Sequence, residues 1–289
     1  MPMRGLRFGS LIGAMLLAAC GQQEANVTPA EVQQASELDA ALVAANFAPT
    51  GTLRVTYLGA NPVHARTDEA TGEVTGPIVD LAVELSRRIG VPYKLVPCQV
   101  ARCIIDAINA KTADVGFLAY EEARAAEADF AGAYALMYSS YLVPTNSPMK
   151  NSAEADSEGV TIGAVKARSQ QIFLNGNIGK GKVVVYDEAP PNEELERLLT
   201  SGELDAFGFN RQTSLDIARA LPSLRVVDDS FFSPPQEFVV AKGQPEKVAA
   251  LIQFTDELRE QGFLKASLEK AGLLVSVGVA PRIVHEPAH

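Results

Sequence analysis

The sequence predicts an α/β protein of two lobes, each a mostly parallel β-sheet flanked by helices. Strand and helix patterns alternate along the chain in two separate sets, and such alternation is typical of parallel sheets covered by helices. A polar stretch marked by prolines, Pro144–Ser157, separates the two sets. The chain from Gly51 to Leu274 is long enough for two domains of ordinary size.

The first set opens with a strand at Thr52–Leu58, followed by apolar residues at helical spacing over Ile78–Ile89. Pro77 suits the first turn of this helix, and Gly90 suits its C-terminal cap. The other elements of the set are a strand at Pro92–Val96, a helix at Ala101–Ala110 and a strand at Asp114–Leu118. This β-α-β-α-β order favours a mostly parallel sheet.

The second set repeats the alternation. Asn192 is a helix-capping residue followed by Glu193 and Glu194, which indicates the start of a helix. The predicted strands are Val160–Val165, Val183–Tyr186, Ala206–Phe209 and Phe238–Ala241, and the predicted helices are Ser169–Leu174, Asn192–Thr200, Pro245–Gly262 and a last one that ends at Ala271. Residues 21–33 and 276–289 show no period, so we expect both to be flexible.

The N-terminal residues predict an export signal that ends at a lipidation site. Arg4 and Arg7 precede a short apolar run, Phe8–Ala19, which ends in small residues before Cys20. The run is too short for a membrane-spanning helix. We expect residues 1–19 to be removed, lipid on Cys20 to anchor the chain to a membrane, and residues 20–47 to form a linker. The alternative is a buried helix with an incidental cysteine.

The other two cysteines predict a disulfide. An exported protein meets an oxidising compartment, where Cys98 and Cys103 would pair once Cys20 carries lipid. The closed loop is short, so its stabilisation should be modest, about 2 kcal/mol. Zinc binding is the alternative, but two thiols without nearby histidines make a poor zinc site. We therefore expect no metal and no cofactor.

The charge balance argues against nucleic acid as a partner. The chain carries 35 acidic and 25 basic residues, a formal net charge of −10. Contact with phosphates requires a basic surface, which this composition does not supply.

Several short motifs occur in a characteristic order. They are Gly51-Thr-Leu-Arg-Val, Thr71-Gly-Glu-Val-Thr-Gly-Pro-Ile-Val-Asp-Leu, Ala123-Arg124, Asp129-Phe130, Tyr134 and Ser201-Gly-Glu-Leu-Asp-Ala206. Over about residues 48–273 the chain thus resembles the type II periplasmic solute-binding proteins, in the family-three branch that includes polar amino acid receptors. The resemblance implies crossings between the lobes at Leu142–Thr145 and Pro234–Val239. Lobe 1 would be residues 48–143 plus 238–273, lobe 2 residues 144–237, and residues 274–289 a flexible tail.

The resemblance also implies a function. Such proteins close around a small solute in the cleft between their lobes and deliver it to the membrane permease of an ABC transporter. We therefore expect a monomeric receptor without enzymatic activity, in the periplasm or on the cell exterior. One alternative is a dehydratase-like enzyme on the same scaffold, with Glu121 as a general acid. Another is a module that binds a protein partner and has a vestigial cleft.

Arg124 aligns with the arginine that binds the ligand carboxylate in amino acid receptors of this family, where a guanidinium offers paired donors. The alternative is an exposed arginine that pairs with Glu121 or Glu127 along a helix. Two family residues differ here. Glu121 replaces a threonine, and Asn210 replaces the aspartate that binds the amino group, so a buried ammonium would lack its charge partner. Glu121 either supplies that charge or neutralises Arg124.

Arg168 and Ser169 occupy the family's turn at a helix start, where backbone N–H groups attract anions. The alternative for Arg168 is an arginine in a turn that is exposed to solvent.

Aromatic side chains at strand ends are candidate walls of the site, with a place in the core as the alternative. They are Tyr57, Phe117, Tyr120, Phe207 and Phe209. His64 lies in the loop after the first strand, a usual lining position in this family, but we expect it to be exposed at the surface. We expect a small anionic solute, a carboxylate or modified amino acid, with an apolar ligand second.

Overall fold

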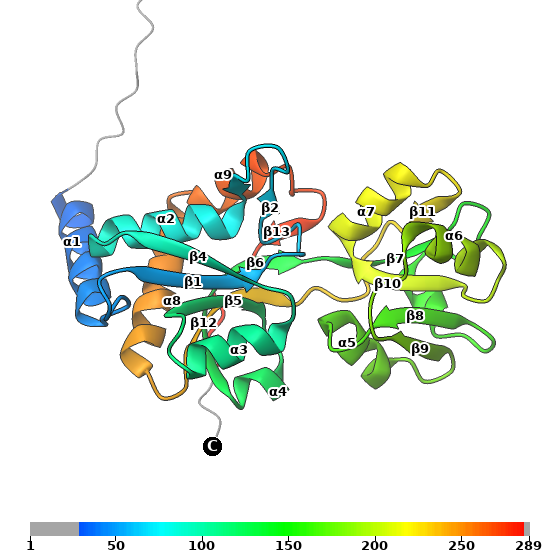
Figure 1. Cartoon of the computed structure of the whole chain (residues 1–289), viewed down its shortest axis with the longest axis horizontal. Helices are drawn as coiled ribbons and strands as arrows, with labels where there is room; N and C mark the ends of the chain where they lie inside the picture. The colour runs from blue at the N-terminus through cyan, green and yellow to red at the C-terminus, as the bar shows by residue number, and fades with distance from the viewer. Residues whose placement is uncertain (1–28, 286–289) are drawn as a thin grey trace, which may run out of the picture.

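The computed structural model describes residues 29–285, and the side chains of residues 37–285. Two α/β lobes lie side by side along the long axis of the molecule, with lobe 1 on the left and lobe 2 on the right of Figure 1. The predicted signal peptide and Cys20 lie outside the described residues. Between residues 29 and 285, no helix combines the length and the apolar character needed to cross a membrane.

Lobe 1 contains a six-stranded sheet in the order β13-β6-β12-β5-β1-β4. Its strands are β1 (Leu53–Leu58), β4 (Tyr93–Cys98), β5 (Val115–Ala119), β6 (Ala128–Met137), β12 (Pro235–Ala241) and β13 (Val277–Val279). β1 pairs in parallel with β4 and β5, whereas β12, β6 and β13 pair antiparallel. The three strands predicted as a β-α-β-α-β unit, β1, β4 and β5, are parallel as expected, and the antiparallel strands β12, β6 and β13 extend them into a mixed sheet.

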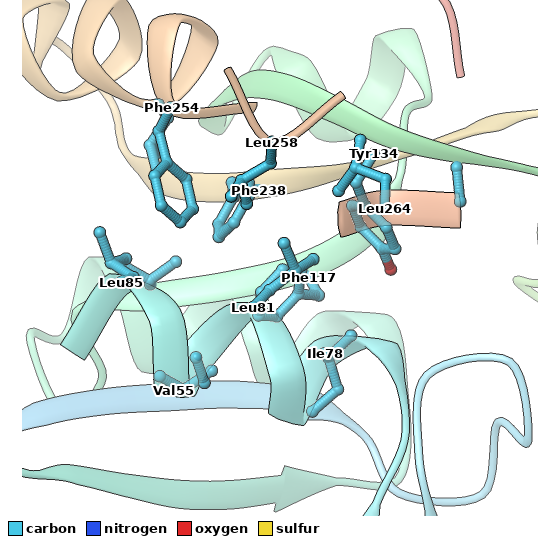
Figure 2. Close-up of a cluster of buried hydrophobic side chains, with 14 of the residues drawn as sticks. Val55, Ile78, Leu81, Leu85, Phe117, Tyr134, Phe238, Phe254, Leu258 and Leu264 are labelled. Atoms are coloured by element: carbon cyan, nitrogen blue, oxygen red, sulfur yellow. The ribbon is translucent and has the colours of Figure 1, made fainter. Parts of the chain in front are cut away.

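Helices cover both faces of this sheet (Figure 1). They are α1 (Pro29–Ala44), α2 (Pro77–Ile89), α3 (Ala101–Asn109), the short α4 (Glu122–Ala125), α8 (Pro245–Glu260) and α9 (Phe263–Lys270), and a small hairpin joins β2 (Arg66–Thr67) to β3 (Val74–Thr75). Helix α2 begins at Pro77 and ends at Gly90, whose φ of 70° lies in the left-handed region, as the sequence predicts. Figure 2 shows Ile78, Leu81 and Leu85 of α2 facing an aromatic core built around Phe238.

Lobe 2 contains a five-stranded sheet in the order β11-β7-β10-β8-β9. Its elements are β7 (Ser139–Pro144), the 3-10 helix η1 (Ser152–Ala155), β8 (Thr161–Val165), α5 (Ser169–Asn177), β9 (Lys182–Tyr186), α6 (Asn192–Thr200), β10 (Ala206–Asn210), α7 (Arg211–Ala220) and β11 (Leu224–Val226). β8 lies parallel to β9 and β10, and β7 is antiparallel to β10 and β11. Neighbouring residues of β7, Tyr141 and Leu142, belong to different apolar clusters, so both faces of the sheet are covered.

The first crossing lies at another position than predicted, whereas the return crossing overlaps the start of its predicted range. β6 ends at Met137 in lobe 1 and β7 begins at Ser139 in lobe 2, so the first crossing is at Tyr138. Residues 142–145 lie inside lobe 2. The return crossing reaches β12 at Pro235, and the Ser139 N–H donates to the Phe232 carbonyl oxygen at 2.8 Å, which joins the two crossings. The first prediction was wrong because β6 and β7 form one nearly continuous extended run without a turn residue to mark the boundary.

The predicted linker and flexible tail are in large part ordered pieces of lobe 1. Helix α1 contacts α2 and α8 and buries Leu38 and Leu42 in the core. At the other end, β13 pairs with β6, and His285 Nε2 lies 2.7 Å from Glu237 Oε1. The prediction of a linker is wrong for residues 29–47, and that of a flexible tail is wrong for residues 274–285. A three-residue strand and a weakly amphipathic helix carry little periodic signal in the sequence.

Cys98 and Cys103 form a disulfide, with their Cα atoms 5.7 Å apart. Cys98 is the last residue of β4 and Cys103 lies in the first turn of α3. The bond therefore closes a tight loop where the strand passes into the helix.

The packing of α1 can be tested by two adjacent substitutions. We expect Leu42→Ala to lower the free energy of unfolding by about 2–5 kcal/mol, because it removes a fully buried side chain and leaves a cavity. Val43→Ala is the matched control, since Val43 is 57% exposed and should change stability by less than about 0.5 kcal/mol. Urea denaturation of both variants measures the difference. Equal, small losses would contradict a structural role for α1.

Because Cys98 and Cys103 are bonded to each other, we expect both to resist alkylation even in unfolded protein, where burial no longer shields them. In urea without reductant, iodoacetamide should modify neither Cys98 nor Cys103, and after reduction it should modify both, as mass spectrometry would show. Replacing both residues by alanine should cost about 2 kcal/mol of stability, as expected for a short closed loop. Modification of both thiols in unreduced protein would refute the bond.

Candidate functional site

A cavity of about 740 Å³ lies between the lobes. Lobe 1 supplies the end of β1, the loop after Cys98, the end of β5 and Arg124 of α4. Lobe 2 supplies the end of β8, the start of α5, the loop after β9 and the end of β10. The crevice beyond the carboxyl ends of parallel strands is the usual ligand position in open α/β sheets. The cavity is therefore the candidate site.

Arg124 reaches from lobe 1 to lobe 2. Its Nη1 donates to the Ala119 carbonyl oxygen at 2.9 Å and to Ser169 Oγ at 3.4 Å, and its Nη2 donates to the Ala167 carbonyl oxygen at 3.2 Å. No described carboxylate forms an ion pair with Arg124, and Glu127 pairs with Arg102 instead. Burial lowers the pKa of Arg124, the nearby Glu121 raises it, and the charge of Arg168 lowers it further. A guanidinium nevertheless keeps its proton in proteins.

Arg168 is the second cation of the cavity. It follows Ala167, whose φ of 58° lies in the left-handed region that residues with a side chain rarely adopt. The Ala167 N–H donates to Gln171 Oε1 at 2.9 Å, which holds this turn at the start of α5. Burial lowers the pKa of Arg168. Within the described part of the chain, its guanidinium has no hydrogen bond and no ion pair.

Glu121 lies close to Arg124 but does not line the cavity. Burial raises its pKa, while a hydrogen bond from Ser169 and the charge of Arg124 lower it in part. Its Oε1 atom is buried without a hydrogen-bond partner. Ser169 thus accepts a hydrogen bond from Arg124 and donates one to Glu121, which links the two charges without direct contact.

Asn210 lines the cavity at the end of β10. Its Oδ1 accepts the Thr213 N–H at 2.9 Å and caps the N-terminus of α7. The side-chain carbonyl is therefore occupied, and the amide NH₂ group is the part of the side chain left for a ligand. Asn210 acts as a donor where an aspartate would act as an acceptor.

The aromatic candidates lie mostly in the core. Tyr57 and Phe117 pack inside lobe 1, at 3% and 0% exposure, and Phe207 packs inside lobe 2. These three take the alternative place in the core, because their central strands are buried on both faces. Tyr120 stacks on His285 with ring centroids 3.7 Å apart and does not line the cavity. Phe209 does line it.

Several polar residues at the cavity were missed by sequence reasoning. Asn61, Gln170 and Gln236 line it, and none belongs to a motif that would distinguish it from an ordinary surface residue. Behind Gln236 lies His64, which is fully buried and places Nε2 3.1 Å from Gln236 Oε1. Burial lowers the pKa of His64 to about 4, so this ring is neutral. Across residues 29–285, no group of three or more His, Cys, Asp or Glu side chains is arranged to hold a metal ion.

Solved structures of similar fold include solute receptors. The solute receptor for L-cysteine of Neisseria gonorrhoeae is 21% identical, with 83% of this chain and 99% of that chain covered and a TM-score of 0.66. A binding component of an ABC transporter from Wolinella succinogenes, complexed with lysine, is 22% identical over 76% and 95% of the two chains, with a TM-score of 0.64.

A third similar structure is an ancestral amino-acid-binding protein described as a precursor of cyclohexadienyl dehydratase. It is 23% identical, with 81% of this chain and 98% of that chain covered and a TM-score of 0.62. At such identities the likeness concerns the fold. Comparison with curated proteins gives no match.

The two-lobed α/β fold predicted from the sequence is confirmed by these structures. At the level of sequence, the model of one family matches residues 53–272, which run from the first strand of lobe 1 to the end of its last helix. The chain belongs to the bacterial extracellular solute-binding proteins, family 3.

Proposed function

We propose that this protein is the substrate-binding lipoprotein of an ABC-type uptake system and that it binds a small anionic solute between its lobes. One observation carries the choice of an anion. Arg124 and Arg168 come from opposite lobes, face one cavity and have no carboxylate in ion-pair contact among the described residues. Both arginines are half-buried, and a partly desolvated cation without a charge partner is costly, so a bound anion would offset that cost.

The arrangement of the lobes supports capture by closure. Over residues 29–285, two chain crossings join the lobes, and few polar contacts bridge the cleft beside Arg124. Arg66 pairs with Asp216 at 2.9 Å, and Ser276 donates to Gln212 at 2.6 Å. Such contacts can open and re-form as the lobes rotate about the crossings. The loaded, monomeric protein would then present both lobes to a membrane permease.

A dehydratase-like enzyme is the second candidate. Glu121 favours it, because a carboxyl group with a raised pKa and one buried oxygen without a partner has the character of a general acid. Its place outside the cavity lining argues against it. The aromatic residues proposed for an apolar ligand lie mostly in the core, which favours the anionic solute.

The role of Arg124 can be tested by ligand-induced stabilisation. A solute identified by mass spectrometry after denaturation of the purified protein should raise the thermal midpoint of the native chain, since it binds only the folded state. Arg124→Ala should weaken binding by about 2–5 kcal/mol, a factor of about 30 or more, and remove most of that shift. Arg87→Ala is the control, because Arg87 is exposed, distant from the cavity and paired with Glu84. A full shift in the Arg124 variant would reject an anion site.

Membrane anchoring is a separate prediction. Cys20→Ala should prevent lipidation and move the protein from the membrane fraction to the soluble fraction, because its apolar anchor is lost. Cell fractionation with antibody detection measures this. Cys103→Ala is the control, and it should leave the protein with the membranes. Unchanged fractionation of the Cys20 variant would contradict the lipoprotein proposal.

A further inference from the structure

The cavity lining carries four basic side chains, but two of them are neutralised by the protein. Lys166 Nζ lies 2.8 Å from Asp187 Oδ1. Arg102 lies 2.7 Å from Asp106 and 2.7 Å from Glu127. The side chains of Arg102 and Lys166 are more than half exposed. Each is paired with a carboxylate and screened by solvent, so neither adds much positive charge for a ligand in the cleft.

Arg124 and Arg168 remain as two uncompensated positive charges. They stand on opposite lobes, close enough that the charge of Arg168 acts on Arg124. Two like charges in a poorly solvated cavity destabilise each other. A ligand with one negative charge would neutralise only one of them, whereas a ligand with two would neutralise both. Glu188 is the lining carboxylate without an ion pair in the described structure, but it is exposed on the loop after β9 and well solvated.

The acceptors beside Arg124 and Asn210 are neutral and already accept one hydrogen bond each, so a ligand ammonium group would lack a charge partner there. The carbonyl oxygens of Ala119 and Ala167 accept the N–H groups of Arg124. The side-chain oxygen of Asn210 accepts the Thr213 N–H, which leaves the NH₂ donor as the unengaged group of this lining side chain. An ammonium group has three donors and no acceptor, so next to Asn210 it would meet another donor. Glu121 is engaged with Ser169 outside the lining.

We propose that the solute is a dicarboxylate without an ammonium group, with one carboxylate at Arg124 and the other at Arg168. The inference rests on the proposed function and narrows its ligand class. Asn210 then donates its amide NH₂ to the oxygen-bearing part of the ligand between the two carboxylates. Bidentate pairing with a guanidinium gives each end both charge and geometry.

Isothermal titration calorimetry with matched compounds tests this ligand class. The probes are four- to six-carbon dicarboxylates with and without a 2-oxo group, the monocarboxylates of equal chain length, and L-aspartate and L-glutamate, which add an ammonium group. We expect the best dicarboxylate to bind at least about 30-fold more tightly than its monocarboxylate and at least about tenfold more tightly than its amino analogue.

Variants test the two ends separately. Arg168→Gln should weaken the dicarboxylate about 30-fold or more and the monocarboxylate less than about threefold, because only the former reaches this residue. Arg219→Gln, an exposed arginine of lobe 2 that does not line the cavity, is the charge-matched control. Glu121→Gln should leave dicarboxylate binding unchanged or stronger, since a nearby negative charge is removed.

The outcomes separate the two proposals. Tightest binding by an amino acid, together with its loss in Glu121→Gln, would overturn the dicarboxylate and leave the receptor function intact. If mono- and dicarboxylates bind equally and Arg168→Gln changes neither affinity, the dicarboxylate proposal is also overturned and the receptor function is left intact. Failure of all probes, with no solute released from the purified protein, would overturn both proposals.

Discussion

The hydrogen bond between Ser139 and Phe232 joins the two crossings, and the arrangement of both lobes depends on the pairing there. β6 leaves lobe 1 at Met137 and β7 starts lobe 2 at Ser139, while β12 brings the chain back beside β6. β6 and β7 thus form one nearly continuous run that takes part in both sheets. A rotation at Tyr138 moves a whole sheet, because the hydrogen bonds on either side keep each lobe rigid. The cleft lies directly beside this junction, with Met137 and Gln236 in its wall.

The cleft combines groups that are unfavourable in isolation. Arg124 and Arg168 are largely desolvated without carboxylate partners, Glu121 has a buried oxygen without a hydrogen bond, and Ala167 adopts a left-handed backbone conformation. Each of these features costs stability. They lie at or beside one cavity, whereas the buried Arg88 on the far side of lobe 1 is paired with Glu84 and Glu257. Such local conflicts with folding rules are expected where binding is the purpose of the site.

The sequence was informative where a pattern is periodic or belongs to a motif. α2 and β1 were placed within a residue or two because their apolar residues recur at a clear spacing. Arg124, Ser169, Arg168 and Asn210 were placed at the cavity through family motifs, and the structure brings all four to its wall. The failures also have physical causes. Helix α7 was not predicted, because its buried residues Gln212 and Ser214 are polar and its apolar Ile217 and Ala218 are only partly buried. Gln236 lines the cavity because it stands at the start of β12, where the return crossing enters lobe 1.

The order of strands in lobe 1 also sets the order in which the protein can fold. β12 lies between β5 and β6 in the middle of the sheet, yet it follows the whole of lobe 2 in the sequence. Lobe 2 is a single uninterrupted segment and can complete its sheet as soon as β11 has formed. Lobe 1 must keep β5 and β6 apart, with their edges unpaired, until β12 arrives. Pairing of residues so distant in sequence is slow, and open strand edges invite association with other chains. A chain that crosses a membrane before folding therefore depends on protection of this half-built sheet during export.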